Sequence, residues 1–367
     1  MSIPGFKNSS LYRLVIIQFF KRCPINFRRF ALVPKEYNAK GIGLLLQGYC
    51  NLLYAVNKKQ SLAIEFGSVE EIKSQIHNLA TLLISLRSQG DYHGACWGYN
   101  FDWQARLSFI FPKFTPTVVA TSFCAKALIS AYEATGKKEY LDVALSSAQF
   151  VINDLHRTNS NGGFLFSYSP LKGNDTVYNA SLLGSELLSC CYKYTREEKY
   201  KELARLSVNA CCRGQQENGA WLYGKLPIQN WVDSFHTGYN LVALNTYQQF
   251  TGDTSFKNYI SKGLYYYLNN FFETDGAPKY YDDKKYPIDI HCPAQLFVTL
   301  SRLDILEENK ELANKVLKWT INNMQSPKGY FYYQIKPFLN SRISYMRWSN
   351  AFMFNALTYY LLKYSEN

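Results

Sequence analysis

Residues 230–244, with the sequence NWVDSFHTGYNLVAL, bring several chemically active side chains to the start of an apolar run. They supply a carboxylate, an imidazole, a phenol and an amide, from Asp233, His236, Tyr239 and Asn240, with Trp231 beside them. Imidazole and phenol groups can transfer protons to or from a reacting centre. An aspartate just before a helix is also a common N-cap, so Asp233 has both a structural and a catalytic interpretation.

Similar groups occur at other points of the chain. Asp289 and His291 lie in the segment PIDIHCPAQ, and Asp102 lies in the segment WGYNFDW. His291 follows His236 by 55 residues, about one repeat length, so both should project towards the same face. The remaining candidates for ligand contact are Trp97, Tyr99, Asn100, Asn179, Arg347 and Trp348. Because an arginine is rarely buried without a partner, Arg347 is a candidate for binding an acidic group.

These residue types fit three kinds of function. Hydrolysis of a glycosidic bond needs two carboxylates beside that bond, and Asp102, Asp233 and Asp289 are the candidates. Elimination or C5 epimerisation of a uronate needs a base such as His236 or Tyr239, together with a group that neutralises the carboxylate, such as Asn179 or Arg347. His291 is a further candidate for substrate binding. The third function is binding alone, as a glycan-binding or scaffold protein. We expect a glycoside hydrolase first and keep the other two as alternatives.

The elements that must position these residues form a repeat. Glycine followed by aromatic residues recurs at Gly94, Gly162, Gly219, Gly276 and Gly329. An apolar run follows each of these loops, and a sixth run lies earlier, at residues 38–56. Runs that are apolar almost all round predict helices buried on both sides. A second, more amphipathic run follows the apolar one in most repeats, which predicts an outer partner helix, and residues 10–23 are a candidate for the sixth outer helix.

This pattern resembles the six-hairpin glycosidase-like, or (α/α)6-barrel, proteins over roughly residues 35–365. The resemblance implies an all-α toroid, with inner helices forming a ring and outer helices around it. It also implies an oligosaccharide or polysaccharide substrate, bound where the inner helices begin. Known members include hydrolases, lyases, epimerases and non-catalytic relatives, and the chain also resembles proteins of surface-polysaccharide synthesis. A helical solenoid is the alternative architecture, and fold alone does not determine function.

The positive charge is concentrated near the N-terminus. The net charge is +12, yet residues 1–60 contain ten Lys and Arg residues against one acid, Glu36. We therefore predict two parts, a basic amphipathic segment at 1–34 and a toroid domain at 35–367. Residues 7–35 could contact an anionic membrane surface, or could form an ordinary helix docked on the fold. Nucleic acid is not expected as a partner, because no recognition motif accompanies the charge.

The nine cysteines are scattered and odd in number, which argues against a disulfide framework. A cytoplasmic protein with buried thiols is the prediction, placed at the inner membrane surface if the basic segment binds lipid. Asp289, His291 and Cys292 are too close together to predict a zinc site. No phosphate-binding loop or nucleophile elbow is present, so we expect neither a metal nor another cofactor.

Overall fold

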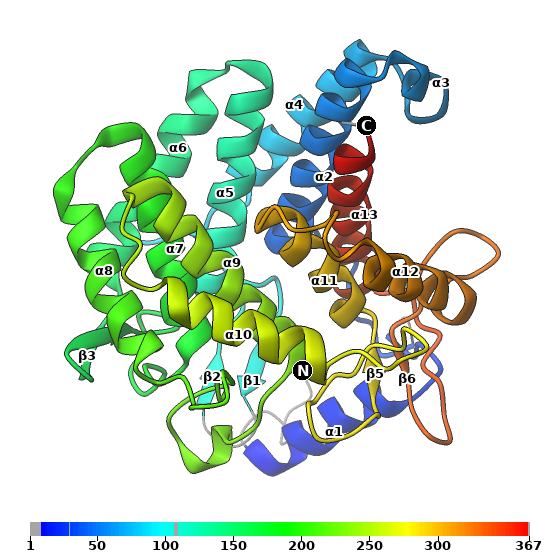
Figure 1. Ribbon diagram of the computed structural model, residues 1–367. Helices are drawn as coiled ribbons and strands as arrows, with labels where there is room; N and C mark the ends of the chain where they lie inside the picture. Colours follow the sequence, from blue (N-terminus) through cyan, green and yellow to red (C-terminus); the bar gives the residue numbers. More distant parts are fainter. Residues whose placement is uncertain (1–8, 29, 106–108, 366–367) are drawn as a thin grey trace.

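Six apolar helices form the inner ring of the protein. The computed structural model describes residues 9–28, 30–105 and 109–365. The inner helices are α2 (Ala39–Lys58), α5 (Val118–Thr135), α7 (Tyr178–Thr195), α9 (Ser234–Thr251), α11 (His291–Arg302) and α13 (Phe352–Tyr364). Each packs on the next, and α13 packs back on α2 (Figure 1). Because the ring closes, the toroid is confirmed and the solenoid is excluded.

Five outer helices surround this ring. They are α4 (Val69–Ser85), α6 (Lys138–Gln149), α8 (Glu198–Cys212), α10 (Lys257–Asn270) and α12 (Lys310–Met324). Each packs on the inner helix that precedes it in the chain, as a helical hairpin should. Their buried positions lie on one face, whereas α7 is buried along nearly its whole length. The two hydrophobic patterns in the sequence therefore separate the inner from the outer layer.

The loops between hairpins carry short antiparallel strands. The strands are β1 (Trp103–Ala105), β2 (Phe109–Phe111), β3 (Arg157–Ser160), β4 (Gly163–Phe166), β5 (Ile288–Asp289) and β6 (Gln334–Ile335). They pair as β1–β2, β3–β4 and β5–β6. Figure 1 shows them gathered at one end of the toroid, where the inner helices begin. The shorter elements are η1 (Gln60–Leu62), α3 (Ala63–Phe66) and η3 (Pro227–Gln229), and the π-helical turns η2 (Phe150–Asp154) and η4 (Met346–Ala351).

The recurrent glycines have a steric explanation. A Cβ at Gly94 would lie 2.0 Å from the carbonyl oxygen of Ser146 on α6, and one at Gly163 would lie 2.0 Å from that of Leu206 on α8. Gly219 and Gly276 approach the backbone of α10 and α12 in the same way, whereas a Cβ at Gly329 would meet nothing within 4 Å. Four of the five loops therefore need glycine because they cross the backbone of an outer helix.

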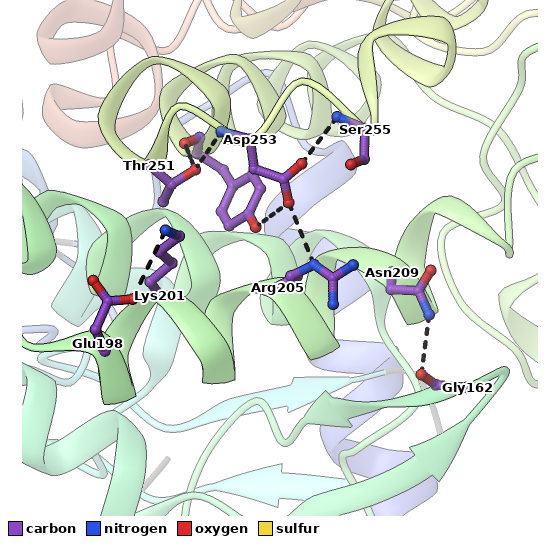
Figure 2. Close-up of polar contacts among 9 residues, drawn as sticks. Gly162, Glu198, Lys201, Arg205, Asn209, Thr251, Asp253 and Ser255 are labelled. Atoms are coloured by element: carbon purple, nitrogen blue, oxygen red, sulfur yellow. Dashed lines mark hydrogen bonds and ion pairs between the residues drawn. The ribbon is translucent and has the colours of Figure 1, made fainter.

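Neighbouring hairpins are also joined by polar contacts. Asp253, in the turn between α9 and α10, accepts hydrogen bonds from the Tyr247 hydroxyl at 2.7 Å and from the Ser255 amide at 3.0 Å (Figure 2). The Arg205 Nε atom of α8 lies 3.4 Å from the same carboxylate. The Asn209 side chain of α8 donates to the carbonyl oxygen of Gly162 in the β3–β4 turn. These contacts fix the middle and the C-terminal part of α8 relative to its neighbours.

The first helix does not complete the outer ring. α1 (Ser10–Arg22) lies at the end that carries the strands (Figure 1), so it does not occupy the sixth outer position that the sequence suggested for it. The guanidinium of Arg28, just after α1, lies 4.8 Å from the Tyr345 ring centre. At the sixth outer position, α2, α3, α12 and α13 instead line a mainly apolar groove of about 630 Å³.

Candidate functional site

The start of α9 holds an aspartate and a histidine in direct contact. Asp233 is the N-cap, and its Oδ1 atom accepts from the His236 amide at 3.0 Å. Its Oδ2 atom accepts from the indole of Trp231 at 3.0 Å and lies 2.7 Å from His236 Nδ1. The carboxylate is buried, while the His236 side chain keeps 21% of its surface exposed. Asp233 is thus both a cap and the group that orients the imidazole.

A second aspartate and histidine occupy the start of α11. The Oδ1 atom of Asp289 accepts from the His291 amide at 3.0 Å and from the indole of Trp348 at 2.8 Å. Its Oδ2 atom accepts from Gln334 at 3.0 Å, across the β5–β6 pair. Asp289 is completely buried. The two repeats therefore share one arrangement, in which an indole and a backbone amide hold a carboxylate at the start of an inner helix.

The rings of the two histidines, His236 and His291, both contact the ring of Phe235. The Phe235 ring lies 4.2 Å from the ring of His236 and 4.4 Å, stacked, from that of His291. The Tyr239 hydroxyl is 2.6 Å from His291 Nε2, whereas His291 Nδ1 is buried and has no hydrogen-bond partner in the described part of the chain. Burial, followed by the charge of Lys40, holds the pKa of His291 well below its usual value. His291 is therefore neutral at neutral pH. Because burial also raises the pKa of Tyr239, the Tyr239 hydroxyl keeps its proton and donates a hydrogen bond to His291 Nε2.

Two cations complete this group. Lys40, in the first turn of α2, is 4% exposed and lies over the rings of Phe123 at 3.9 Å and Tyr239 at 5.4 Å. Burial and then the charge of Arg347 hold the pKa of Lys40 well below its usual value. Arg347 lies over the Tyr99 ring at 5.0 Å. Among the described residues, no carboxylate is within ion-pair distance of either cation.

We call these residues the axial cluster: Lys40, Asp233, His236, Tyr239, His291 and Arg347. Sequence reasoning placed five of them together at the mouth of the toroid but missed Lys40. The available signal was a lysine in the first turn of a run that is otherwise apolar all round, where a charge has to be buried. The lysine lies beside Gly41, whose Cβ would meet the Arg347 side chain at 3.4 Å, so the two cations share the same end of the ring.

Other predicted residues occupy different surroundings. Trp97 is completely buried and its indole donates to the Leu83 carbonyl, so it belongs to the core and not to a ligand surface. Asp102 is exposed before β1 and accepts from the Lys113 amide at 2.8 Å. Asn100 accepts from Asn38 at 2.7 Å. The structure therefore does not place Asp102 as a third carboxylate against the axial cluster.

Two asparagines of the inner helices remain available for contacts. Asn179 in α7 and Asn240 in α9 are 3% and 2% exposed, and the Oδ1 atom of each has no hydrogen-bond partner among the residues that the structure describes. An unpaired buried amide oxygen costs free energy, which a ligand or an ordered water can recover. Tyr99 contacts the axial cluster through Arg347, Trp231 contacts it through Asp233, and Trp348 contacts it through the ring of His291, with ring centres 4.8 Å apart.

The same described ranges also bear on metal binding and on membrane spanning. There, no group of three or more His, Cys, Asp or Glu side chains is arranged to hold a metal ion. No helix within those ranges has the length and apolar character needed to cross a membrane. All nine cysteines are free, and burial raises the pKa of Cys292 and Cys124, which contact this end of the ring. Their thiols are therefore protonated and poorly reactive.

Comparison with known proteins identifies the fold. No family model and no curated protein sequence matches this chain. Among solved structures, the chain is similar to a GH76 α-mannanase of Bacteroides thetaiotaomicron, with TM-score 0.66, 14% identity and coverage of 98% of this chain and 97% of that one. It is similar to the cellobiose 2-epimerase of Bacillus thermoamylovorans, with TM-score 0.63, 14% identity and coverage of 89% and 87%. A polysaccharide lyase gives TM-score 0.59, 12% identity and coverage of 98% and 98%.

These three neighbours confirm the predicted six-hairpin, (α/α)6-toroid fold. They are a hydrolase, an epimerase and a lyase by name, so they do not select one activity. At 12–14% identity they establish the fold alone. The choice of chemistry has to come from the residues of this chain.

Proposed function

We propose that the chain is a carbohydrate-processing enzyme that removes a proton beside the carboxylate of a uronate, as a lyase or a C5 epimerase does. The observation that carries this proposal is the pairing of proton-transfer groups with two cations, Lys40 and Arg347, that have no carboxylate partner in the part of the chain that the structure describes. Such cations are expensive to maintain unless a ligand supplies the missing negative charge. A uronate carboxylate is an anion of the required kind, adjacent to an acidic C–H bond.

His236 is the proposed base. Its Nδ1–H donates to Asp233 Oδ2, which leaves Nε2 as the acceptor and fixes the orientation of the ring. Tyr239 is the proposed acid, with His291 as the group that exchanges a proton with it. The centres of the His236 and Tyr239 rings are 5.9 Å apart, so both can act on one sugar residue.

The chemistry proceeds in two steps. His236 accepts the C5 proton, and the electron pair of the C–H bond moves towards the carboxylate, where Arg347 and Lys40 stabilise the added charge. In elimination, that electron pair then forms the C4–C5 double bond as the C4–O bond breaks, and Tyr239 protonates the leaving oxygen. In epimerisation, Tyr239 instead returns a proton to the opposite face of C5.

Hydrolysis, which the sequence favoured first, is less well supported by this geometry. Asp233 and Asp289 are both buried, and both oxygen atoms of each carboxylate already accept hydrogen bonds from the protein. A hydrolase needs one of its two carboxyl groups to protonate the leaving oxygen. Neither aspartate presents a free oxygen atom for that role.

The test is incubation of the purified protein with uronate-containing and neutral oligosaccharides. Unsaturated-uronate absorbance, solvent deuterium uptake and new reducing ends are followed together. We expect unsaturation or deuterium uptake with uronates only, reduced by about 100-fold or more in Asp233→Asn and His236→Ala. The matched control is Asp154→Asn, because Asp154 holds His93 at the same 2.7 Å distance outside the axial cluster. New reducing ends without unsaturation would establish hydrolysis and overturn the proposal.

A further inference from the structure

A polar cavity lies on the axis of the toroid, where all six inner helices meet, and Phe123, which contacts Lys40, is part of its wall. Its volume is about 290 Å³, near the lower end of the usual range for small-molecule sites. All six inner helices contribute to its lining, through residues nearer their C-terminal ends than the axial cluster. Phe123 belongs to this lining and also contacts Tyr239, with ring centres 5.4 Å apart. The cavity is therefore adjacent to the proposed catalytic site and separate from it.

The charges that line this cavity do not cancel. Lys126 pairs with Glu186 at 2.5 Å, and Lys193 pairs with Glu133 at 2.6 Å. The fifth charged side chain, Arg302, has no carboxylate within ion-pair distance in the described part of the chain. The lining thus carries three cations and two anions, an excess of one positive charge.

Arg302 is held in place by neutral groups. Its Nη2 atom donates to Thr246 Oγ1 at 3.1 Å, and its guanidinium also hydrogen-bonds the Tyr359 side chain. A guanidinium has five N–H donors, so these two partners leave donors for a ligand. Thr246 Oγ1 also lies 3.4 Å from Glu186 Oε1, which connects Arg302 to the Lys126–Glu186 pair. The guanidinium is therefore pre-oriented without being neutralised.

An unpaired side-chain amide also indicates that this cavity accommodates a polar ligand. Asn355 of α13 lines the cavity and is 5% exposed, and within the described ranges its Oδ1 atom has no hydrogen-bond partner. A core position with no ligand would be occupied at lower cost by an apolar residue. Gln47 and Ser130, which bond each other at 2.8 Å, add further hydrogen-bonding groups to the lining. The cavity offers one unbalanced cation and several groups that suit hydroxyls.

We propose that this cavity binds a small monoanionic polyhydroxy acid, with its carboxylate on Arg302 and its hydroxyls on Asn355, Glu186 and Gln47. A planar carboxylate matches the fork of a guanidinium, and a single negative charge balances the lining. Solvent has access to one side, because the side chains of Lys193 and Glu133 are 37% and 38% exposed. This binding site does not depend on the activity proposed for the axial cluster.

The test is calorimetric titration of the full chain with D-gluconate and with D-glucitol. The two share a carbon skeleton, but glucitol has a hydroxymethyl group in place of the carboxylate. We expect gluconate to bind at least about tenfold more tightly than glucitol, since an Arg–carboxylate bond is worth 1.4 kcal/mol or more. Equal affinity of the two compounds, or no binding of gluconate, would overturn the proposal.

Variants assign the binding to one cavity. Arg302→Gln should lower gluconate affinity about tenfold or more, and His236→Ala should leave it unchanged. If Arg302→Gln does not fold, Asn355→Leu supplies the same test, because it removes an unpaired amide and should weaken gluconate binding without lowering the melting temperature. Binding that His236→Ala abolishes and that Arg302→Gln and Asn355→Leu retain would place gluconate in the axial cluster and contradict the inference. Loss of uronate activity alone has no bearing on this result.

Discussion

Replacing Lys40 by methionine should stabilise the protein while removing function. The Lys40 side chain is buried against aromatic rings, with no carboxylate within ion-pair distance among the described residues. A buried polar group left unpaired costs about 1–3 kcal/mol, and more when it is charged. A cation–π contact recovers about 0.5–2 kcal/mol of that for the charged form. Methionine has a similar length and no amine, so we expect Lys40→Met to raise the free energy of unfolding by about 1–3 kcal/mol.

Lys126 provides the matched control. It also lies over the Phe123 ring, at 5.2 Å, but it pairs with the buried carboxylate of Glu186. Breaking a buried ion pair by removing one partner costs about 3–5 kcal/mol, and less here because 21% of the Lys126 side chain is exposed. Substitution by methionine should therefore change the free energy of unfolding in opposite directions at the two lysines. Lys126→Met should lower it by about 2–4 kcal/mol.

The pH dependence of this effect has a defined direction. Burial and Arg347 lower the pKa of Lys40 in the folded state, so the unfolded chain binds more protons than the folded one between that pKa and the lysine value of about 10.4. The penalty of Lys40 is fully present below its folded pKa and disappears as the pH rises through about 10.4. The stability gained in Lys40→Met should accordingly shrink as the pH rises from neutral towards that value.

The assay is urea unfolding of the wild type, Lys40→Met and Lys126→Met at about pH 7 and about pH 10. The same samples are assayed for unsaturated-uronate formation and deuterium uptake. We expect the rate of these reactions to be about tenfold or more lower in Lys40→Met, because the lysine charge that stabilises the transition state is absent. A Lys40→Met protein that is less stable than the wild type at neutral pH would refute the reasoning. So would a gain in stability that grows towards alkaline pH.

Three further predictions concern the tyrosine, the glycines and the first helix. Tyr239→Phe should reduce turnover about 100-fold with little change in KM, since it removes a proton-transfer group, and steady-state kinetics would show a KM effect if the role were only in binding. Gly94→Ala should lower the free energy of unfolding by about 3 kcal/mol or more, because its Cβ would clash with the Ser146 carbonyl. Gly329→Ala should lower it by only about 1 kcal/mol, because only its positive φ is unfavourable. Equal melting temperatures of the two variants would contradict the steric explanation. The membrane contact expected for residues 7–35 stays a prediction: Leu11, Val15 and Phe19 are 62%, 57% and 57% exposed, so the chain should sediment with anionic but not neutral vesicles, and deletion of residues 1–34 should abolish this.

The sequence by itself determined the architecture to a large extent. Residues 178–195 form α7 and residues 198–212 form α8, with the boundaries that the two hydrophobic patterns indicate. Local rules suffice here, because the period of the apolar positions separates an all-round buried helix from an amphipathic one. The repeated glycine loops marked the same hairpins, and Gly136 and Gly252 end α5 and α9 in the left-handed conformation.

The candidate site was only partly readable from the sequence. The polar residues at the start of α9 and α11 were identifiable because unusual side chains there interrupt an apolar run. Their roles were not, since an aspartate at an N-cap has the same sequence signature whether its carboxylate faces a ligand or a tryptophan indole. The contact of Trp348 with Asp289, and the burial of Trp97 in the core, depend on residues far apart in the chain.

Tertiary structure alone decided which charges are unpaired. Lys40, Arg302 and Lys126 are all basic residues in apolar helical runs, and nothing in their local sequence distinguishes them. Packing of α7 on α5 brings Glu186 to Lys126, whereas closure of the ring places Lys40 beside Arg347, because η4 and α13 return to pack on α2. Whether a buried charge is balanced depends on distances across the toroid, which no periodicity along the chain encodes.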